Sequence, residues 1–393
     1  MEHVVVVGGG LAGHRAVQEL SGFPGRVTLV GDERHRPYDR PPLSKQVLLG
    51  TMEAGATGFP CDGLDVDWRL GDAAVGLDAD AHVVRLAGGE EVSYDGLVIA
   101  TGRRARPWPE LPQTSGFHLL RSLDDARALQ RATAHASDVV IIGAGFIGCE
   151  VAASLRKQGV DRVTLVDVAA HPMPVIGAVA GNAARRIHEE HGVHFRMGAA
   201  VAGFEHHAGR VVGVRLQDGE LIPAEVVLLA LGSEPNSEWL TGSGVELIRG
   251  NVACDPWCFV RGVDDVVAAG DVAAWAHPHA PEPHGLVCVE HWSTAREMAR
   301  SAVANLLAAP DERRPFSVVP TFWSDQYDVK IKSAGLLAAA THFETVEEDA
   351  AARRLIVEAR RDGELVGAVV FNKNRAIVGY TRELMAAMTS VGV

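Results

Sequence analysis

The feature that most constrains the fold is a glycine-rich unit that occurs twice in the chain. Each copy has an apolar strand, a GxGxxG loop, a segment with helical periodicity, a second strand and an acidic residue. These glycines permit a tight turn, close approach of a pyrophosphate, and packing of the helix on the strand. The key residues are Gly8, Gly10, Gly13 and Asp32 in the first copy, and Gly143, Gly145, Gly148 and Asp167 in the second.

The spacing supports a true duplication, because the acid lies 19 positions after the last glycine in both copies (13 to 32 and 148 to 167). The N-terminus of each following helix offers oriented N–H groups to phosphate. Two ordinary α/β crossovers with incidental glycines are the weaker alternative. Two dinucleotides in one chain indicate a flavin and a nicotinamide, with electron transfer between them.

The bulk properties are those of a soluble protein with more than one domain. A chain of 393 residues exceeds one ordinary core, so two or three domains are expected. The formal charge of −13 argues against nonspecific binding to nucleic acid or anionic lipid. No apolar run reaches the roughly 18 residues that span a bilayer. Because "MEHVVVVGGG" enters a strand without a leader-like segment, a cytoplasmic location is expected.

Cysteine and histidine patterns predict neither a redox disulfide nor a metal site. The five cysteines include no CxxC pair, so they are interpreted as scattered buried thiols. Cys254 and Cys258 stand four apart, which leaves a ligand or redox role as the minor alternative. No acid or cysteine completes a metal site with the Pro-rich segment that contains His277, His279 and His284, so that loop is expected to expose its histidines.

Further segments carry a resemblance to known families. "LVIATGRRARP" (97–107), "VVLLALGSEPN" (226–236) and "VDDVVAAGDVAAW" (263–275) resemble the two-dinucleotide flavoprotein reductases, which have a glutathione-reductase-like α/β fold. "PYDRPPLSK" (37–45), "EHWSTA" (290–295) and "FWSDQYDVKIKSAG" (322–335) resemble the ferredoxin reductases that serve haem-thiolate monooxygenases and ring-hydroxylating dioxygenases. The resemblance implies FAD at the first loop, NAD(H) at the second, and contact of Gly270-Asp271 with the flavin.

The expected organisation is two Rossmann-like dinucleotide-binding domains followed by a C-terminal α+β domain. Residues 75–98 and 201–229 alternate apolar and polar positions and predict a small antiparallel excursion in each of the first two domains. A hairpin is expected around Asp362-Gly363, followed by a helix over 379–390. The limits are 1–112 and 243–313 for the FAD domain, 113–242 for the NAD domain, and 314–393 for the C-terminal domain, with 309–320 as a linker.

The resemblance also assigns cofactor-binding positions residue by residue. Asp32 and Asp167 are expected to bind adenosine ribose hydroxyls, and no arginine follows Asp167 in "VAAHPMPV" to receive a 2′-phosphate. A preference for NADH over NADPH follows. The FAD positions are Gly8, Gly10, Leu11, Ala12, Gly13, Asp32, Arg40, Pro41, Lys45, Ala74, Ala100, Thr101, Gly102, Arg121, Gly270, Asp271, Glu290, Trp292 and Trp323. The NAD positions are Gly143, Gly145, Phe146, Ile147, Gly148, Glu150, Asp167 and Gly232.

The segment "PYDRPPLSK" is interpreted as a rigid arm. Pro41 and Pro42 cannot lie inside a helix but suit its start, so a short helix carrying Lys45 in its first turn is expected. The resemblance places Lys45 beside the flavin N5 edge and Glu150 as its carboxylate partner, which makes these two the candidate catalytic residues. A solvated surface lysine is the alternative.

Two tryptophans and four basic residues are candidates for the electron exit. In the family, the segments containing Trp292 and Trp323 line the flavin, where a flat side chain could shield the ring; core tryptophans are the alternative. Despite the acidic total, local cations are expected to steer an acidic ferredoxin. The candidates are Arg313, Arg314, Lys330 and Lys332.

The sequence is therefore identified as that of an FAD-containing, NADH-dependent ferredoxin reductase. Its expected partner is an iron–sulfur ferredoxin that supplies an oxygenase. An NADH oxidase or a rubredoxin reductase on the same scaffold is one alternative. A sensor of the apoptosis-inducing-factor type, which binds NADH with little turnover, is another.

Overall fold

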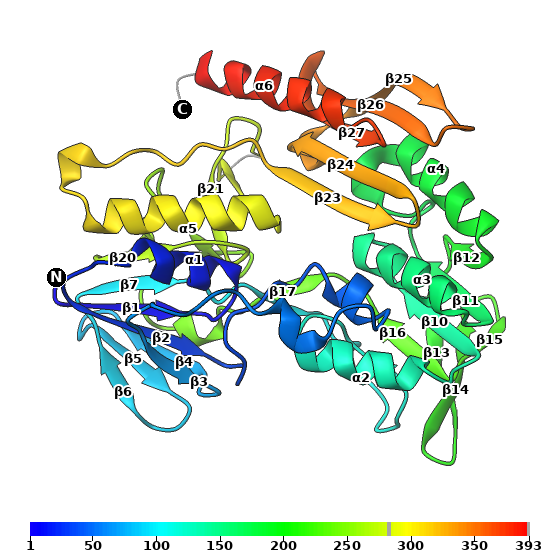
Figure 1. Cartoon of the computed structure of the whole chain (residues 1–393), viewed down its shortest axis with the longest axis horizontal. Coiled ribbons are helices and arrows are strands. Elements are labelled where there is room, and N and C mark those ends of the chain that lie inside the picture. Colours follow the sequence, from blue (N-terminus) through cyan, green and yellow to red (C-terminus); the bar gives the residue numbers. More distant parts are fainter. Residues whose placement is uncertain (281–283, 391–393) are drawn as a thin grey trace.

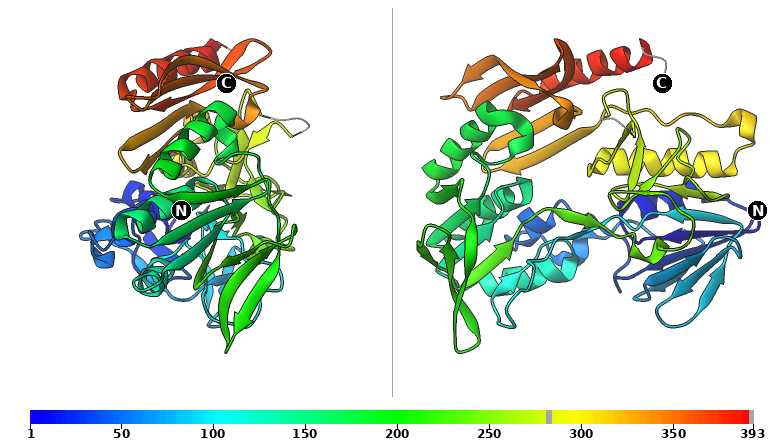
Figure 2. Two further views of the ribbon diagram at one scale, coloured as in Figure 1. Left: turned by 90° about the vertical axis from the view of Figure 1, so that its right-hand side faces the viewer. Right: turned by 180° about the vertical axis from the view of Figure 1, so that it is seen from behind.

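The computed structural model describes residues 1–280 and 284–390. Three units of mixed α/β structure make up the chain, two of them side by side and the third above both (Figure 1). The third unit stays on top of the other two in the side and rear views (Figure 2). No helix within the described ranges is long and apolar enough to cross a membrane.

The first unit is built on a five-stranded parallel sheet in the order β20-β7-β1-β2-β3. The valine run of β1 is buried on both faces, as a central parallel strand requires. Since β20 comes from much later in the sequence, the chain leaves this unit and returns to it. The strands are β1 (His3–Val7), β2 (Arg26–Gly31), β3 (Asp67–Leu70), β7 (Gly96–Ile99) and β20 (Val266–Ala268).

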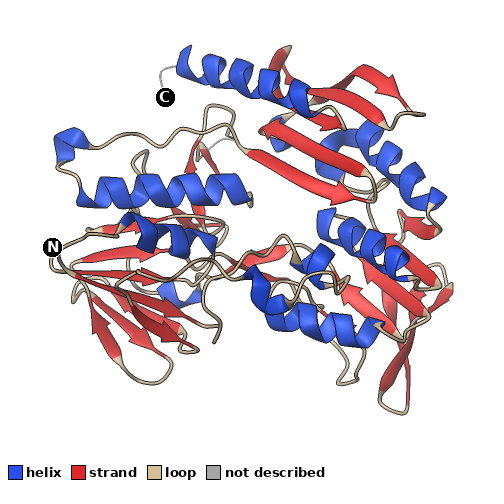
Figure 3. Cartoon of the chain, in the orientation of Figure 1, coloured by secondary structure: helices blue, strands red, loops and turns tan. Residues whose placement is uncertain are grey.

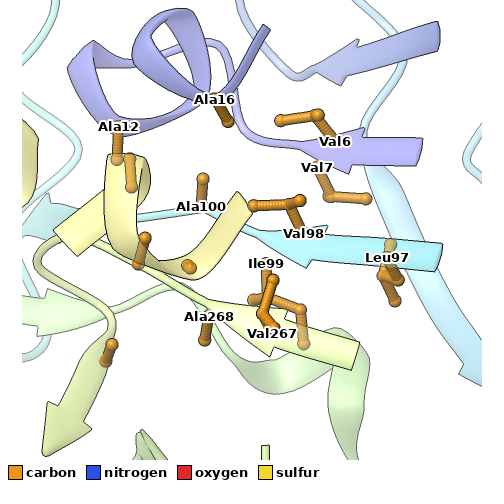
Figure 4. Packing of buried hydrophobic residues seen from close by; sticks show 14 of the residues in the cluster. Val6, Val7, Ala12, Ala16, Leu97, Val98, Ile99, Ala100, Val267 and Ala268 are labelled. Atoms are coloured by element: carbon orange, nitrogen blue, oxygen red, sulfur yellow. The ribbon is translucent and has the colours of Figure 1, made fainter. Parts of the chain in front are cut away.

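Small residues let two helices pack closely on this sheet. Ala12 and Ala16 of α1 (Leu11–Glu19) lie against the side of the sheet formed by Val6, Val98 and Ala100 (Figure 4). Helix α5 (Trp292–Leu307) runs beside α1 and contacts β20. This packing fixes the loop between β1 and α1 relative to the ends of β7 and β20.

The second unit repeats the first. Its five parallel strands have the order β12-β11-β10-β16-β9, with the strand–loop–helix–strand unit again at the centre. The sequence duplication is thus a duplication of architecture. The elements are β9 (Phe117–His118), α2 (Leu123–Thr133), β10 (Asp138–Ile142), α3 (Phe146–Gln158), β11 (Arg162–Asp167), α4 (Gly177–Glu190), β12 (Val193–Met197) and β16 (Val226–Leu229).

Each unit also carries the expected antiparallel excursion, β4-β5-β6 in the first and β13-β14-β15 in the second. A two-stranded ribbon, β8 with β17, joins the two units. The strands are β4 (Ala74–Asp78), β5 (Val83–Leu86), β6 (Glu91–Ser93), β8 (Arg103–Ala105), β13 (Val201–His207), β14 (Arg210–Leu216), β15 (Leu221–Pro223) and β17 (Ser233–Pro235). A small sheet contains β18 (Leu247–Ile248), β19 (Asn251–Ala253), β21 (Ala273–Ala276) and β22 (Leu286–Val287).

The C-terminal unit is an antiparallel sheet, β23-β24-β27-β26-β25, with α6 on one face (Figure 3). The predicted hairpin is confirmed, since Asp362 and Gly363 have φ of 52° and 85° between β26 and β27. Helix α6 begins at Asn374, earlier than the predicted 379. The elements are β23 (Thr321–Gln326), β24 (Val329–Gly335), β25 (His342–Asp349), β26 (Arg354–Arg361), β27 (Glu364–Phe371) and α6 (Asn374–Ser390).

The opposite face of this sheet packs on the second unit. Cys149 and Ile176 share a buried cluster with Ile331, Val357 and Phe371. Burying that face ties the C-terminal unit to α3 and α4, so strand β23 lies against α3. The sheets follow the predicted order of domains, and the exact domain limits stay predictions.

The proline arm differs in detail from the predicted short helix. Residues Leu43–Val47 form one wide helical turn, η1, in which the Val47 N–H donates to the Pro42 carbonyl at 3.0 Å. This hydrogen bond spans five residues instead of the four of an α-helix, so the turn is wider. Such single π-type turns recur at functional sites. The turn contacts α2 and α3, which places Lys45 at the boundary between the first and second units.

Candidate functional site

A cavity of about 1220 Å³ extends from the first glycine loop to the second and is lined by all three units. Its volume exceeds that of a typical small-ligand pocket, which suits two extended dinucleotides meeting end to end. Most of the predicted site residues line it. They are Gly8, Gly10, Leu11, Ala12, Asp32, Arg40, Pro41, Lys45, Ala74, Ala100, Thr101, Gly102, Arg121, Gly145, Phe146, Ile147, Glu150, Gly232, Gly270, Asp271, Glu290, Trp292 and Trp323.

Four predicted residues do not line the cavity: Gly13, Gly143, Gly148 and Asp167. The glycines have a packing role instead. A Cβ on Gly13 would lie 1.8 Å from the Gly8 carbonyl oxygen, and one on Gly148 would lie 2.1 Å from the Gly143 carbonyl oxygen. The third glycine of each loop therefore lets the helix begin against the turn, without facing a ligand.

The first glycine of each loop lets the loop backbone pass close to the end of the neighbouring strand, where a side chain would clash. Gly8 has φ of +124° and Gly143 of +107°, and a Cβ on either would lie 2.1 Å from a carbonyl oxygen of the neighbouring strand end. In contrast, a Cβ on Gly10 or Gly145 would meet nothing within 4 Å. The second glycine of each loop thus borders open space, where a pyrophosphate can approach the backbone.

The loops also leave helix N-termini free for a phosphate. Gly10 and Gly145 are the N-cap residues of α1 and α3, and neither helix start is closed by a side-chain hydrogen bond. The first-turn N–H groups and the positive end of the helix dipole are therefore available to an anion. Both loops fit a dinucleotide pyrophosphate.

The two acids at the strand ends are placed differently. Asp32 lines the cavity. The Asp167 carboxylate accepts the backbone N–H of Ala144 at 2.6 Å and that of Ala169 at 2.8 Å, which holds its charge beside the second loop. Arg196 on the adjacent strand is occupied by Glu220, with Nη2–Oε1 at 2.8 Å. Its guanidinium is thus already paired.

Two arginines are tied into the wall of the first-unit part of the cavity. Arg40 donates to Glu33 Oε1 at 2.7 Å and to the Arg121 carbonyl at 2.6 Å. Arg121 in turn donates through Nη2 to Asp271 Oδ2 at 2.8 Å. These contacts join the proline arm, the start of α2 and the Gly270-Asp271 turn into one polar wall.

The predicted contact between Lys45 and Glu150 is confirmed. Lys45 Nζ lies 2.6 Å from Glu150 Oε2, and the two side chains are 13% and 5% exposed. The lysine is therefore not a solvated surface residue. Two serines that the sequence reasoning missed complete the carboxylate's contacts: Ser44 Oγ donates to Oε2 at 2.5 Å, and Ser324 Oγ to Oε1 at 2.7 Å.

The two predicted tryptophans form an edge-to-face pair at the cavity mouth. Their ring centroids are 5.9 Å apart at an interplanar angle of 70°. Trp292 donates from Nε1 to Asp39 Oδ1 at 2.9 Å, and burial raises the pKa of Asp39. Trp323 is 38% exposed, so it is not a core residue. The pair leads from the cavity to the surface.

The four predicted docking cations lie in two places. Lys332 lies opposite Trp323 in the β23–β24 ladder, and Lys330 is two residues along on the same face. Arg313 and Arg314 follow the far end of α5, whose 16 residues span about 24 Å. Arg313 also stacks over Phe259 at 4.1 Å. The four candidate cations therefore lie in two regions at opposite ends of α5, and their part in docking stays a prediction.

Other residues at the cavity escaped the sequence reasoning. Asp39, Ser44, His291 and Phe322 all line it, and each stands next to a residue that was predicted. Burial lowers the pKa of His291 to about 4, and its Nδ1 has no hydrogen-bond partner among the described residues. The sequence offered one signal for these four residues, which is that each is a direct neighbour of a predicted site residue.

The cysteines are free thiols, four of them buried and Cys288 half-buried. Burial raises the pKa of Cys288 to about 12, which does not favour a reactive thiolate. The expectation of exposed histidines is wrong for His277, which is buried. Within residues 1–280 and 284–390, no cluster of three or more histidine, cysteine or acidic side chains could hold a metal.

Comparison with known proteins gives two family matches. Residues 2–299 match the family described as pyridine nucleotide-disulphide oxidoreductase, and residues 321–392 match the reductase C-terminal family. The first match alone covers more than half of the chain. Together they extend over all three units.

Individual relatives agree with these matches. Rhodocoxin reductase from Rhodococcus erythropolis is 38% identical over 353 residues, which are 86% of this chain and 79% of the relative. The ferredoxin–NAD(+) reductase component of the biphenyl dioxygenase system from Paraburkholderia xenovorans is 33% identical over 390 residues, or 97% of this chain and 93% of the relative.

A solved structure, the covalent complex of putidaredoxin reductase with putidaredoxin, matches with a TM-score of 0.89 at 29% identity. The match covers 98% of this chain and 93% of that one. The likeness thus extends over both duplicated units and the C-terminal sheet. The chain therefore belongs to the pyridine nucleotide-disulphide oxidoreductase family, and within it to the ferredoxin reductases of oxygenase systems.

Proposed function

We propose that this protein passes electrons from NADH through FAD to an iron–sulfur ferredoxin that supplies an oxygenase. The observation that carries the proposal is the single cavity that joins both glycine loops and ends at an exposed tryptophan. Bound FAD would supply the conversion between the two-electron chemistry of NADH and the one-electron chemistry of a ferredoxin. The protein supplies binding, orientation and charge.

Each part of the cavity has a proposed task. The first loop, with Asp32 and the Arg121–Asp271 pair, holds FAD, and the second loop, with Asp167, holds NADH. The Lys45 ammonium lines the cavity that both loops share, where it would favour negative charge on a reduced isoalloxazine. Glu150 fixes that ammonium in place. No side chain is required as a nucleophile.

The surface around Trp323 is the proposed docking site for the ferredoxin. Trp323 is exposed, and Lys330 and Lys332 share its face of the sheet. Arg296 lies over the Trp292 ring at 5.6 Å and adds a third positive charge. Asp325 stands opposite Lys330 on the same face and offsets one of these charges. The remaining positive charges let an acidic partner associate despite the overall charge of −13.

The named relatives support the class of partner. One is a rhodocoxin reductase, one is the reductase component of a dioxygenase system, and one was solved as a complex with putidaredoxin. We therefore propose that this chain, like the named relatives, transfers electrons to a small ferredoxin. A cytoplasmic location, where NADH and ferredoxins are found together, belongs to this proposal.

The experiment is steady-state turnover with NADH and a panel of small iron–sulfur proteins, with cytochrome c reduction as the readout. We expect at least one ferredoxin to raise the rate far above that with cytochrome c alone. Rapid oxygen consumption without ferredoxin would favour an NADH oxidase instead. Tight NADH binding with negligible turnover on every acceptor would favour a sensor.

A further inference from the structure

The Glu150 carboxylate is held by hydrogen-bond donors from both other units. Lys45 and Ser44 donate to Oε2 from the proline arm of the first unit, at 2.6 and 2.5 Å. Ser324 donates to Oε1 at 2.7 Å from strand β23 of the C-terminal unit. Glu150 itself stands on α3 of the second unit. Its orientation is therefore set by three parts of the chain at once.

Behind Ser324 the hydrogen bonds continue in one direction. The Gln326 amide nitrogen donates to Ser324 Oγ at 3.1 Å, and its oxygen accepts from His188 Nε2 at 2.8 Å. Tyr327 OH stands 3.4 Å from His188 Nδ1, on the side where a neutral ring accepts. Each donor points toward the next residue, and the series ends on the carboxylate.

The series is shielded from water. Ser324, Gln326 and His188 are 0%, 2% and 1% exposed. Burial lowers the pKa of His188 to about 4, so the imidazole is neutral at pH 7 and keeps one N–H for Gln326. A buried polar network with each member paired holds its groups in fixed positions, whereas the loss of one member leaves others unpaired.

We propose that Ser324, supported by Gln326 and His188, is a positioning residue that holds Glu150 against Lys45 for flavin reduction. The C-terminal unit thus takes part in the reductive step as well as in partner docking. This proposal rests on the proposed function of the Lys45–Glu150 pair. Alternation along β23 explains how one strand serves both tasks, since Trp323 faces outward while Ser324 and Gln326 face inward.

The test compares Ser324→Ala with a matched control, Ser333→Ala, in the FAD-loaded protein. Ser333 is a buried serine on the neighbouring strand β24, and its hydroxyl has no hydrogen-bond partner among the described residues. Ser324→Thr keeps the hydroxyl, and Gln326→Met removes the supporting amide at similar volume. These two variants keep the test informative if Ser324→Ala folds poorly.

We expect Ser324→Ala to slow the limiting rate of flavin reduction by NADH about tenfold, while the Kd for NAD+ stays within about twofold. The flavin midpoint potential should also fall, because a carboxylate with one donor fewer exerts more negative charge on the ring. A tenfold change in the equilibrium constant for flavin reduction corresponds to a shift of about 30 mV in the midpoint potential of a two-electron couple. Ser324→Thr should recover most of the rate, and Gln326→Met should lose about threefold.

A double-mutant comparison separates positioning from general packing. In a Glu150→Gln background, Ser324→Ala should lower the rate further by less than about twofold, because the carboxylate charge that it holds against Lys45 is already gone. The proposal would be overturned if the effects of Ser324→Ala and Glu150→Gln on the rate were fully additive. It would also be overturned if Ser324→Ala matched Ser333→Ala in reduction rate and midpoint potential. Failure of the proposed function is a separate result: the wild-type protein itself would not be reduced by NADH.

Discussion

Lys45 Nζ lies 2.6 Å from Glu150 Oε2, although the two residues stand 105 positions apart in the chain. The contact joins the proline arm of the first unit to the first turns of α3 in the second. It therefore forms only when both units are folded and docked. A buried ion pair with this placement is costly to break from one side, because the remaining charge loses its compensation.

Lys45→Ala is expected to slow flavin reduction by NADH by one to two orders of magnitude, or about 1.4–2.8 kcal/mol of transition-state stabilisation. FAD should stay bound, because Lys45 is one contact among many along the cavity. Lys45→Arg should restore only part of the rate, since a planar fork does not replace a compact ammonium. Stopped-flow absorbance of the flavin is the measurement.

The matched control for Lys45 is Lys157→Ala, which removes an exposed lysine from the C-terminal end of α3. It should leave the rate of flavin reduction unchanged. A Lys45→Ala protein reduced as fast as the wild type would show that the ammonium has no part in the reaction, and the proline arm would need another explanation.

The two glycine loops predict separate losses of the two cofactors. A methyl group on Gly10 or Gly145 would enter open space that a pyrophosphate needs, with little strain in the protein itself. Gly10→Ala should therefore fold but lose FAD, while Gly145→Ala should stay yellow and bind NADH about tenfold more weakly, at about 1.4 kcal/mol. The ratio of visible to protein absorbance, together with titration by NAD+, tests both. Exchange of the two phenotypes would reverse the cofactor assignment.

Asp167 predicts a preference for NADH over NADPH. Its carboxylate is held beside the second loop. If that loop binds NADH as proposed, the 2′-phosphate of NADPH would approach this carboxylate. Repulsion between the Asp167 carboxylate and this phosphate, partly screened by solvent, should cost about 2 kcal/mol. That cost corresponds to roughly 30-fold in kcat/KM. Asp167→Ala should bring the kcat/KM values for NADH and NADPH closer together, whereas Asp161→Ala, next to the other end of β11, should not. Equal kcat/KM for both nucleotides in the wild type would refute the assignment.

Charge reversal distinguishes the two basic regions. Lys330→Glu places an acid on the Trp323 face and should lower kcat/KM for an acidic ferredoxin about three- to tenfold at low salt. The effect should shrink as salt rises, because the Debye length is about 8 Å at physiological ionic strength. Arg314→Glu, beyond the far end of α5, is the control and should have little effect. Equal losses from both variants would place the docking surface elsewhere.

Local patterns were sufficient to predict the duplicated units and their loop residues, whereas most other cavity residues were assigned through the family resemblance. The glycine spacing follows from constraints within one turn, so Gly8, Gly10 and their counterparts could be placed without a structure. The Lys45–Glu150 contact needed the resemblance as well, since nothing in either segment names its partner. The hairpin at Asp362-Gly363 was likewise a local signal, set by two residues with positive φ.

Contacts between units were not predictable in the same way. Ser324 meets Glu150 across 174 positions, and Gln326 meets His188 across 138, so both contacts depend on how the C-terminal sheet packs on α3 and α4. The separation of the four candidate cations into two regions could not be predicted for the same reason. Arg313 and Lys330 are close in sequence, but the length of α5 and the course of the linker place them apart.

The most direct test of the whole account is an anaerobic titration followed by a partner. One equivalent of NADH per bound FAD should bleach the flavin absorbance of the yellow protein, and two equivalents of an oxidised one-electron ferredoxin should then restore it within the turnover time. The expected balance is one NADH consumed for two ferredoxins reduced. Protein that folds without taking up FAD, or bound flavin that NADH does not bleach, would contradict the account.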